Sequence, residues 1–436
     1  MKLFNDVARR LIILSFRRNF EYSPPVAKIP EDIKMPEKRY TRKMSYNDRL
    51  FAVVERICPP CLNQFVAEGE GSFDVEKWRD AVRIASAANP GSRLVLKGHL
   101  GRSRWVDSGN TPPVTEVDGN SWDGMGPAGA PFLDKGLCLR NGPTSEVLLI
   151  NGSPLRVCFR THHAVMDGMG LLTWMEDIFR VLRGEEPKGS TATITDTELA
   201  RANQTEYRKP FPRNNIAPTG KPSGRKRGVT WKRVIIPGSY KNTLGQVVVL
   251  AAREAWRYQD GPVRFAIPVD LRFRQKGLRS TANLAIAIYV EVKKDSTPAD
   301  IAEDIRKQVA EKRDCMIDRT DPFLRFLPMM YLTRKGNSRI ENCNKTGLYG
   351  SSGLISNMGK VPVQFFSGGG FNTRLIWGIP PSIENIPFLI GFAIRDDEVT
   401  LSLGVPEVLA GENRVDTFFK NLLEGLVPAD EGSGKK

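Results

Sequence analysis

The sequence contains no hydrophobic run that approaches the ~20 residues a helix needs to cross a bilayer. The longest apolar run near the start is Leu11–Leu14, and arginines flank it on both sides. This run is too short for a signal peptide, and no cleavage site of small residues follows it. We therefore expect a cytoplasmic protein.

Cysteine is also scarce, with six residues in a chain of 436. Small secreted proteins that depend on disulfides are much richer in cysteine. Cys58 and Cys61 have a CxxC spacing, but the other cysteines supply no second pair for zinc, and a thioredoxin-like context is missing. We expect structural cysteines and no bound metal.

Acidic residues are outnumbered, since 49 Asp and Glu face 64 Lys and Arg and leave a net charge of +15. Such a field attracts anions, and the partner could be nucleic acid, an anionic membrane surface, or an acidic or phosphorylated molecule. No zinc-finger or RNA-binding signature is present and only 8% of the residues are aromatic, so we expect no nucleic-acid binding. A basic surface without a specific partner stays an alternative.

Composition divides the chain into four parts. Residues 1–40 form a basic extension whose apolar residues share one face of a helix. This pattern predicts docking on the protein itself or, through residues 1–25, peripheral contact with a membrane. Two folded halves are predicted at 41–186 and 230–436. The polar segment between them, 187–229, contains several prolines and a basic cluster and is typical of a crossover linker.

Hydrophobic periodicity predicts the elements of both halves. In the first half, the predicted strands are 61–70, 93–98, 147–150 and 155–161, and the predicted helices begin after Ser45, span 74–88 and run from Gly168 to Gly184. In the second half, the predicted strands are 234–237, 263–269, 284–292, 354–357, 388–394 and 399–403, and the predicted helices are 243–258, 298–316 and 415–426. A long surface loop is predicted at 107–136. Because strands and helices mix without regular βαβ alternation, we predict an α+β fold in two layered halves.

Two of the three histidines in the chain are adjacent, at His162 and His163, and Asp167 and Gly168 follow them. They lie where a predicted strand ends and a helix begins. Because successive strand residues point to opposite faces, the two imidazoles cannot easily bind one metal ion. A neutral histidine near pH 7 is a natural general base. The alternative is a buried structural pair at a strand end.

The segment His162–Gly168, HHAVMDG, resembles the His-His-x-x-x-Asp-Gly signature of condensation domains and of acyltransferases with the chloramphenicol acetyltransferase fold. Further similar landmarks extend the resemblance over residues 44–425: Tyr46–Phe51, Phe73–Pro90, Arg264–Arg272 and Ser356–Gly359. The resemblance implies two similar halves in a V, each a mixed or mainly antiparallel sheet with helices. It also implies a tunnel between the halves with the motif at its middle.

The same resemblance implies roles for single residues. His163 is expected to accept the proton of the acceptor, and His162 to be structural. Asp167 is expected to form a salt bridge, for which Arg272 is the candidate partner. Gly168 is expected to let the backbone approach the substrate closely, and its N–H is a possible oxyanion donor.

In the second half, the resemblance places Ser356 and Asn357 as substrate-binding residues. The expected donor is an acyl-phosphopantetheine on an acidic carrier protein, or acyl-CoA, with no bound cofactor. The basic cluster Arg225, Lys226 and Arg227 is expected to steer this donor, and a flexible solvated loop is the alternative. The expected acceptor is a small alcohol or amine.

The Asp-Phe-Gly-Trp-Gly signature of plant-type relatives is absent, and we expect a free-standing enzyme. Its expected activity is transfer of an acyl group from a thioester, forming an ester or amide in natural-product or lipid biosynthesis. Two alternatives remain: a wax-ester or lipid acyltransferase at the membrane surface, and a non-catalytic condensation-like module that recruits a carrier protein.

Overall fold

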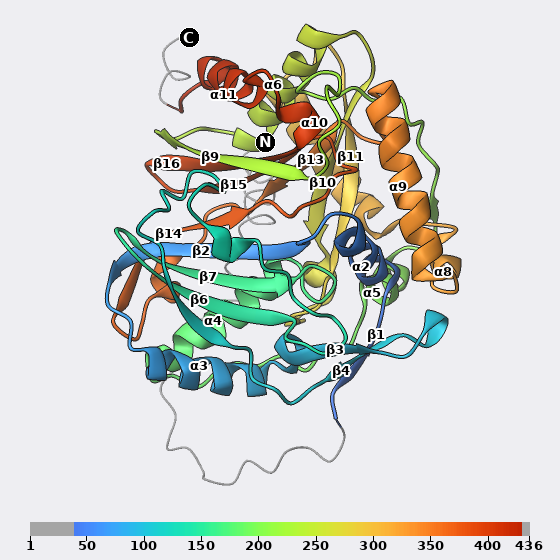
Figure 1. Ribbon diagram of the computed structural model, residues 1–436. Helices are drawn as coiled ribbons and strands as arrows, with labels where there is room; N and C mark the ends of the chain where they lie inside the picture. Colours follow the sequence, from blue (N-terminus) through green and yellow to red (C-terminus); the bar gives the residue numbers. More distant parts are fainter. Residues whose placement is uncertain (1–38, 430–436) are drawn as a thin grey trace.

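The computed structural model describes residues 39–429, and two large sheets dominate it (Figure 1). The five-stranded sheet has the order β14-β2-β7-β6-β5, and only its β5–β6 pair is parallel. Its strands are β2 (Leu62–Gly71), β5 (Val114–Asp118), β6 (Ser145–Asn151), β7 (Leu155–His162) and β14 (Phe371–Ile379). Helices α3 (Val75–Ala88) and α4 (Gly168–Leu182) pack on one face of this sheet.

The six-stranded sheet has the order β11-β10-β13-β15-β16-β9 and is parallel only at β10–β13 and β13–β15. Its strands are β9 (Val229–Pro237), β10 (Val263–Asp270), β11 (Ala285–Val292), β13 (Gly353–Asn357), β15 (Leu389–Ile394) and β16 (Glu398–Pro406). One face is covered by α6 (Thr243–Tyr258), α7 (Pro298–Ala310) and α11 (Arg414–Gly425). This mixture of sheets and helices confirms the predicted α+β class.

The core of the five-stranded sheet is aromatic. Trp78 of α3, Phe159 of β7 and Phe179 of α4 are fully buried and contact one another at ring-centroid distances of 5.4–6.2 Å. Such edge-on and tilted pairs add to the stability gained from the buried area alone. This packing holds the end of β7 and the start of α4 on a rigid base.

Strand β14 crosses between the two halves of the chain. It comes from the segment 230–436 but pairs with β2, with Ile379 opposite Gln64 and Phe371 opposite Gly71. The sequence analysis predicted no strand here, and it placed this whole segment in one half. The pairing instead makes the second half of the chain an edge of the first sheet.

Several predicted boundaries differ from the structure. The predicted surface loop 107–136 contains β5, and the predicted linker 187–229 contains α5 (Asp196–Asn203) and β8 (Tyr207–Arg208). The helix predicted over 298–316 ends at Ala310. The remaining elements are short, apart from α2 and α9: β1 (Thr41–Lys43), α2 (Tyr46–Ile57), β3 (Leu94–Lys97), β4 (Arg104–Asp107), β12 (Ile317–Asp318), α8 (Asp321–Leu324), α9 (Met329–Thr346) and α10 (Glu407–Ala410).

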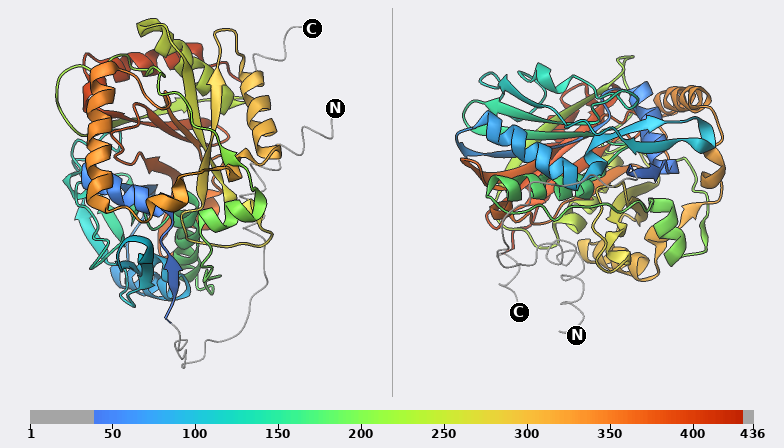
Figure 2. Two further views of the ribbon diagram at one scale, coloured as in Figure 1. Left: turned by 90° about the vertical axis from the view of Figure 1, so that its right-hand side faces the viewer. Right: turned by 90° about the horizontal axis from the view of Figure 1, so that it is seen from below.

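Helix α9, which the sequence analysis did not predict, runs along one side of the molecule, and one of its ends lies beside α2 (Figure 2). Among residues 39–429, no helix combines the length and the apolar character needed to cross a membrane. The predicted amphipathic helix and the membrane contact through residues 1–25 lie outside the described residues.

Candidate active site

His162 is the last residue of β7 and is fully buried. Its Nδ1 accepts a hydrogen bond from the backbone N–H of Ala164 at 3.0 Å, so the neutral ring carries its proton on Nε2. That nitrogen lies 3.8 Å from Oε2 of Glu55. Burial, together with the neighbouring His163, lowers the pKa of His162 to about 3. The ring is therefore neutral at pH 7 and faces the interior.

His163 follows directly and is half-buried. Its backbone N–H donates to the carbonyl of Cys61 at 3.1 Å, and its own carbonyl accepts from the Asn283 side chain at 3.2 Å. The imidazole stacks on Phe51 of α2, with ring centroids 3.7 Å apart and the planes inclined by 9°. Packing therefore fixes the plane of the ring, while the two hydrogen bonds fix the backbone of His163.

The imidazole of His163 is a neutral base with one reachable nitrogen. Burial lowers its pKa to about 4, although its own backbone carbonyl and the charge of Asp167 oppose this shift. Nδ1 is buried and has no hydrogen-bond partner among the described residues. No described residue hydrogen-bonds Nε2 either, and because the residue as a whole is half-buried we take Nε2 as the nitrogen that a substrate can reach. At pH 7 this ring can accept a proton from a group that reaches it.

Asp167 caps α4 and is bound on both carboxylate oxygens. Its Oδ1 accepts from the N–H of Gly170 at 2.7 Å and from Nη2 of Arg272 at 2.9 Å. Its Oδ2 accepts from Nη1 of Arg272 at 3.1 Å and from the N–H of Leu284 at 2.6 Å. The structure thus pairs Asp167 with Arg272 in a buried, two-point ion pair, which joins the helix after the histidines to the chain after β10.

Arg272 is itself saturated with acceptors. It donates to Asp270 at 2.6 Å and to the carbonyls of Ser280 and Ala282 at 2.8 and 2.5 Å. Burial alone would lower the pKa of Arg272, but the carboxylates of Asp167 and Asp270 outweigh it and raise the pKa above its usual value. We call Asp167, Asp270 and Arg272 the anchor.

Two glycines at the start of α4 differ in how closely other chain segments approach them. A Cβ on Gly168 would lie 3.1 Å from the ring edge of Phe65, which is a tight contact with a side chain. A Cβ on Gly170 would lie 2.4 Å from the backbone carbonyl oxygen of Thr281. The closest approach of another backbone segment to α4 is therefore at Gly170. The expected approach of substrate at Gly168 stays a prediction.

Ser356 and Asn357 lie at the end of β13, on opposite faces of the sheet. Ile355 belongs to the core beneath α6, so Leu354 and Ser356 face the other way. Leu354 packs in the cluster that contains Phe51 and Cys61, next to His163. The face of Ser356 is thus the face nearer His163, whereas Oδ1 of Asn357 accepts a hydrogen bond from Gly359 N–H at 2.7 Å.

The basic cluster predicted to steer the donor is partly neutralised within the chain. Lys226 pairs with Glu407 at 3.0 Å, and Arg227 pairs with Glu384 at 2.5 Å. Arg225 is exposed and makes no ion pair with the described residues. Two of the three charges therefore serve contacts inside the protein.

The two cysteines of the CxxC spacing are buried and free. Burial raises the pKa of the Cys58 thiol to about 11, and it raises the pKa of Cys61 well above the ordinary value. Within residues 39–429, no group of three or more His, Cys, Asp or Glu side chains is placed to hold a metal ion.

Sequence reasoning missed residues that are distant from the histidines in the sequence but contact them in the structure. Phe51, Glu55 and Asn283 contact the pair or its backbone, and Leu284 binds Asp167. Phe51 was predicted to lie on a helix, but nothing near it in the sequence indicates the stacking partner. Asn283 precedes the predicted strand 284–292 and Leu284 begins it, and nothing in the sequence there indicates a contact with the histidine segment.

Comparison with solved structures shows the fold, although no protein-family model and no curated protein match the chain. The first condensation domain of the calcium-dependent antibiotic synthetase is 14% identical, with a TM-score of 0.60 over 88% of this chain and 95% of that one. Polyketide synthase associated protein 5 from Mycobacterium tuberculosis is 16% identical, with a TM-score of 0.59 over 90% and 99%.

A third similar structure is a variant of the starter condensation domain of rhizomide synthetase RzmA, in complex with C8-CoA. It is 12% identical, with a TM-score of 0.58 over 90% of this chain and 97% of that one. These likenesses show that the chain has the fold of condensation domains and chloramphenicol acetyltransferase-like acyltransferases. The fold implied by HHAVMDG is thereby confirmed.

Proposed function

We propose that this protein transfers an acyl group from a thioester to an alcohol or amine, with His163 as the general base. The observation that carries the proposal is a neutral imidazole with a reachable Nε2, held against Phe51 on the fold of condensation domains. Such a group is what the attack of a hydroxyl or amine on a thioester needs.

In the proposed step, the acceptor oxygen or nitrogen attacks the thioester carbonyl carbon while its proton passes to Nε2 of His163. The tetrahedral intermediate then collapses, the C–S bond breaks, and the leaving thiolate takes the proton from the imidazolium. A pKa of about 4 keeps the base free at pH 7 but makes it weak. The proton therefore moves only as bond formation makes the acceptor acidic. A positioned base of this kind contributes about 10²–10⁴-fold in rate.

The surrounding residues have positioning roles in this proposal. Phe51 and the Asn283 side chain hold the ring and the carbonyl of His163, and the anchor holds the end of the loop at Asp167. Gly168 opens α4, where first-turn N–H groups have no partner within the helix and the helix dipole favours negative charge. Its N–H is the proposed donor to the oxyanion of the intermediate.

The proposed donor is an acyl-CoA or an acyl-phosphopantetheine on an acidic carrier protein, and no cofactor stays bound. The similar structure that contains C8-CoA supports a thioester of this kind. The proposed acceptor is a small alcohol or amine, so that the product is an ester or amide in natural-product or lipid biosynthesis. Ser356, on the face of β13 nearer His163, is the residue of the predicted substrate-binding pair that we retain for acceptor contact.

The test is a thiol-release assay with a panel of acyl-CoA donors and with alcohol and amine acceptors. Wild-type protein is expected to release thiol only when an acceptor is present. His163→Ala is expected to lower kcat by about 10²–10⁴-fold while the protein stays folded. His99→Ala removes an exposed histidine and serves as the matched control, with turnover unchanged. Full turnover by folded His163→Ala would contradict the proposal.

A further inference from the structure

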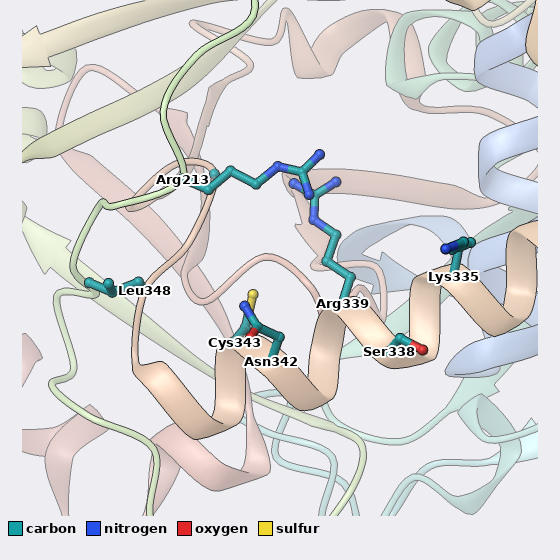
Figure 3. A pocket seen from close by; sticks show the side chains of 8 residues that line it. Arg213, Lys335, Ser338, Arg339, Asn342, Cys343 and Leu348 are labelled. Atoms are coloured by element: carbon teal, nitrogen blue, oxygen red, sulfur yellow. The ribbon is translucent and has the colours of Figure 1, made fainter.

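A pocket of about 280 Å³ lies between α9, the segment around Arg213 and the chain that leads into β13 (Figure 3). Its charged lining consists of Arg213, Lys335 and Arg339, and Ser338 and Asn342 add polar groups. None of the described carboxylates lines it. Its volume is near the lower end of the ~300–1,000 Å³ found for small-molecule sites, which suits one end of a ligand better than a whole large cofactor.

The two arginines of this pocket face each other, and neither has a polar partner in the described part of the chain. Figure 3 shows the guanidinium of Arg339, on α9, pointing toward that of Arg213. Neither side chain makes a hydrogen bond or ion pair with residues 39–429, and Nζ of Lys335 lies 5.7 Å from the ring centroid of Tyr331. Burial lowers the pKa of Arg339, and the charge of Arg213 lowers it further. Like charges that converge in this way are stabilised by an anion between them.

The pocket lies close to the His163 neighbourhood along the chain. Gly350 lines the pocket, and Leu354, four residues later, packs with Phe51 and Cys61. Four residues span at most about 14 Å. Helix α9 also packs on α2, since a Cβ on Gly336 would lie 2.5 Å from Cδ1 of Ile57. A ligand with an anionic end and a long flexible arm therefore fits this arrangement.

We propose that Arg213, Lys335 and Arg339 bind a phosphate group of the thioester donor. This inference rests on the proposed function, because it takes the donor to be CoA or a phosphopantetheine arm, in which phosphate and thiol stand at opposite ends of the pantetheine chain. Planar guanidinium groups suit phosphate oxygens, and Lys335 adds a point charge. The pocket thus takes the place of the partly neutralised cluster Arg225–Arg227 in donor recognition.

The experiment measures equilibrium binding of CoA, phosphopantetheine and phosphate-free pantetheine by titration calorimetry. Arg213→Gln and Arg339→Gln are each expected to weaken binding of a phosphate-bearing ligand by about 10-fold or more. Pantetheine binding is expected to stay unchanged. Arg334→Gln removes an exposed charge from the same helix outside the pocket and is the matched control, with no expected effect.

The arms of the experiment separate the two sources of phosphate. Weaker binding of both CoA and phosphopantetheine assigns the pocket to the 4′-phosphate that a carrier-bound arm also has. Weaker binding of CoA alone assigns it to the phosphates of the adenosine end. Equal binding by wild type and both variants, or an equal loss in Arg334→Gln, would overturn the proposal.

A structural role for the arginines is tested by the melting temperature. Removing one of two facing like charges is expected to leave Tm unchanged or raise it, so a lower Tm with weaker binding of all three ligands would also overturn the proposal. Since binding is measured without turnover, the result is independent of the role of His163. Normal turnover of His163→Ala beside a loss of phosphate binding in the arginine variants would contradict the proposed function and leave the phosphate site standing.

Discussion

Two polar regions, the histidine pair and the anchor, meet within six residues of the chain. They differ in how many of their polar atoms have hydrogen-bond partners. In the anchor, both oxygens of Asp167 and every guanidinium nitrogen of Arg272 have partners. In the histidine pair, Nε2 of His162 and Nδ1 of His163 are buried without a hydrogen bond to any described residue. Most buried polar groups in proteins are paired, so such exceptions need an explanation.

The difference separates scaffold from reactive group. A saturated ion pair has one low-energy arrangement, and it fixes the start of α4 against the chain after β10. Nε2 of His163 has no hydrogen bond to a described residue, so it can instead accept and release a proton without first breaking a contact. The anchor therefore holds the loop while the chemistry is left to His163. Experiments can test this contrast between the anchor and the histidine pair.

The largest expected effect comes from opening the anchor with Arg272→Met. This change removes the cation from the buried carboxylate of Asp167, which costs about 3–5 kcal/mol in the free energy of unfolding. Urea denaturation measures it. The control is Arg83→Met, which breaks an exposed pair with Asp80 and is expected to cost at most about 1 kcal/mol. A similar loss in both variants would show that the anchor is no more than a surface ion pair.

The next prediction tests how closely the segment that contains Thr281 packs against α4. Gly170→Ala places a Cβ against the Thr281 carbonyl, and the backbone there cannot move without disturbing the bond from Arg272 to Ala282. We expect a loss of about 1–3 kcal/mol in unfolding free energy. Gly168→Ala, the matched control, meets only the ring edge of Phe65 and is expected to be nearly neutral. Equal losses in denaturant melts would remove the distinction between the two glycines.

A third effect concerns pH and the histidine pair. The folded-state pKa values of about 3 and 4 for His162 and His163 lie below the ordinary 6.5. The unfolded chain therefore binds protons first, and stability is lost as pH falls from about 6.5 toward 4, by up to about 1.4 kcal/mol per pH unit for each histidine. His162→Asn keeps an acceptor for Ala164 but cannot become charged.

The test compares the slopes of unfolding free energy against pH for wild type and His162→Asn. The variant is expected to lose about 1.4 kcal/mol less per pH unit below pH 6.5. Buried carboxylates act in the opposite direction, since burial raises the pKa of Asp196 to about 7, but they are common to both proteins and cancel in the comparison. Parallel slopes would mean that His162 is protonated as easily in the folded state as in the unfolded chain.

Local sequence patterns predicted many of the helices and strands of the fold. The helix predicted over 243–258 matches α6, and the predicted helix 74–88 differs from α3 by one residue, because both alternate apolar and polar residues at helical spacing. Helix α9 escaped prediction because only Ile340 and Cys343 of its 18 residues are buried. Strand β14 escaped because its pairing with β2 joins residues about 300 positions apart, which no local pattern encodes.

The candidate site likewise has one part that local sequence predicted and one part that it did not. The adjacent histidines and the strand before them predicted two imidazoles in different environments, and the structure has one fully buried and one half-buried. The supports came from elsewhere in the chain, because Phe51 belongs to another element of the same half and Asn283 belongs to the second half. Spacing within a motif shows what chemistry is present, whereas contacts between distant segments determine how it is held.

The smallest expected effect tests whether packing holds His163 as hydrogen bonds hold Arg272. The stacked pair with Phe51 is expected to contribute about 0.5–1.5 kcal/mol beyond buried area, measured as the coupling energy of Phe51→Leu and His163→Ala in a double-mutant cycle of unfolding free energies. Phe51→Leu with His99→Ala is the control cycle, with no coupling expected because His99 is exposed. If both cycles gave the same value, the ring would owe its position to backbone bonds alone. A real coupling would show instead that the base is held by a ring contact that leaves Nε2 free for the substrate.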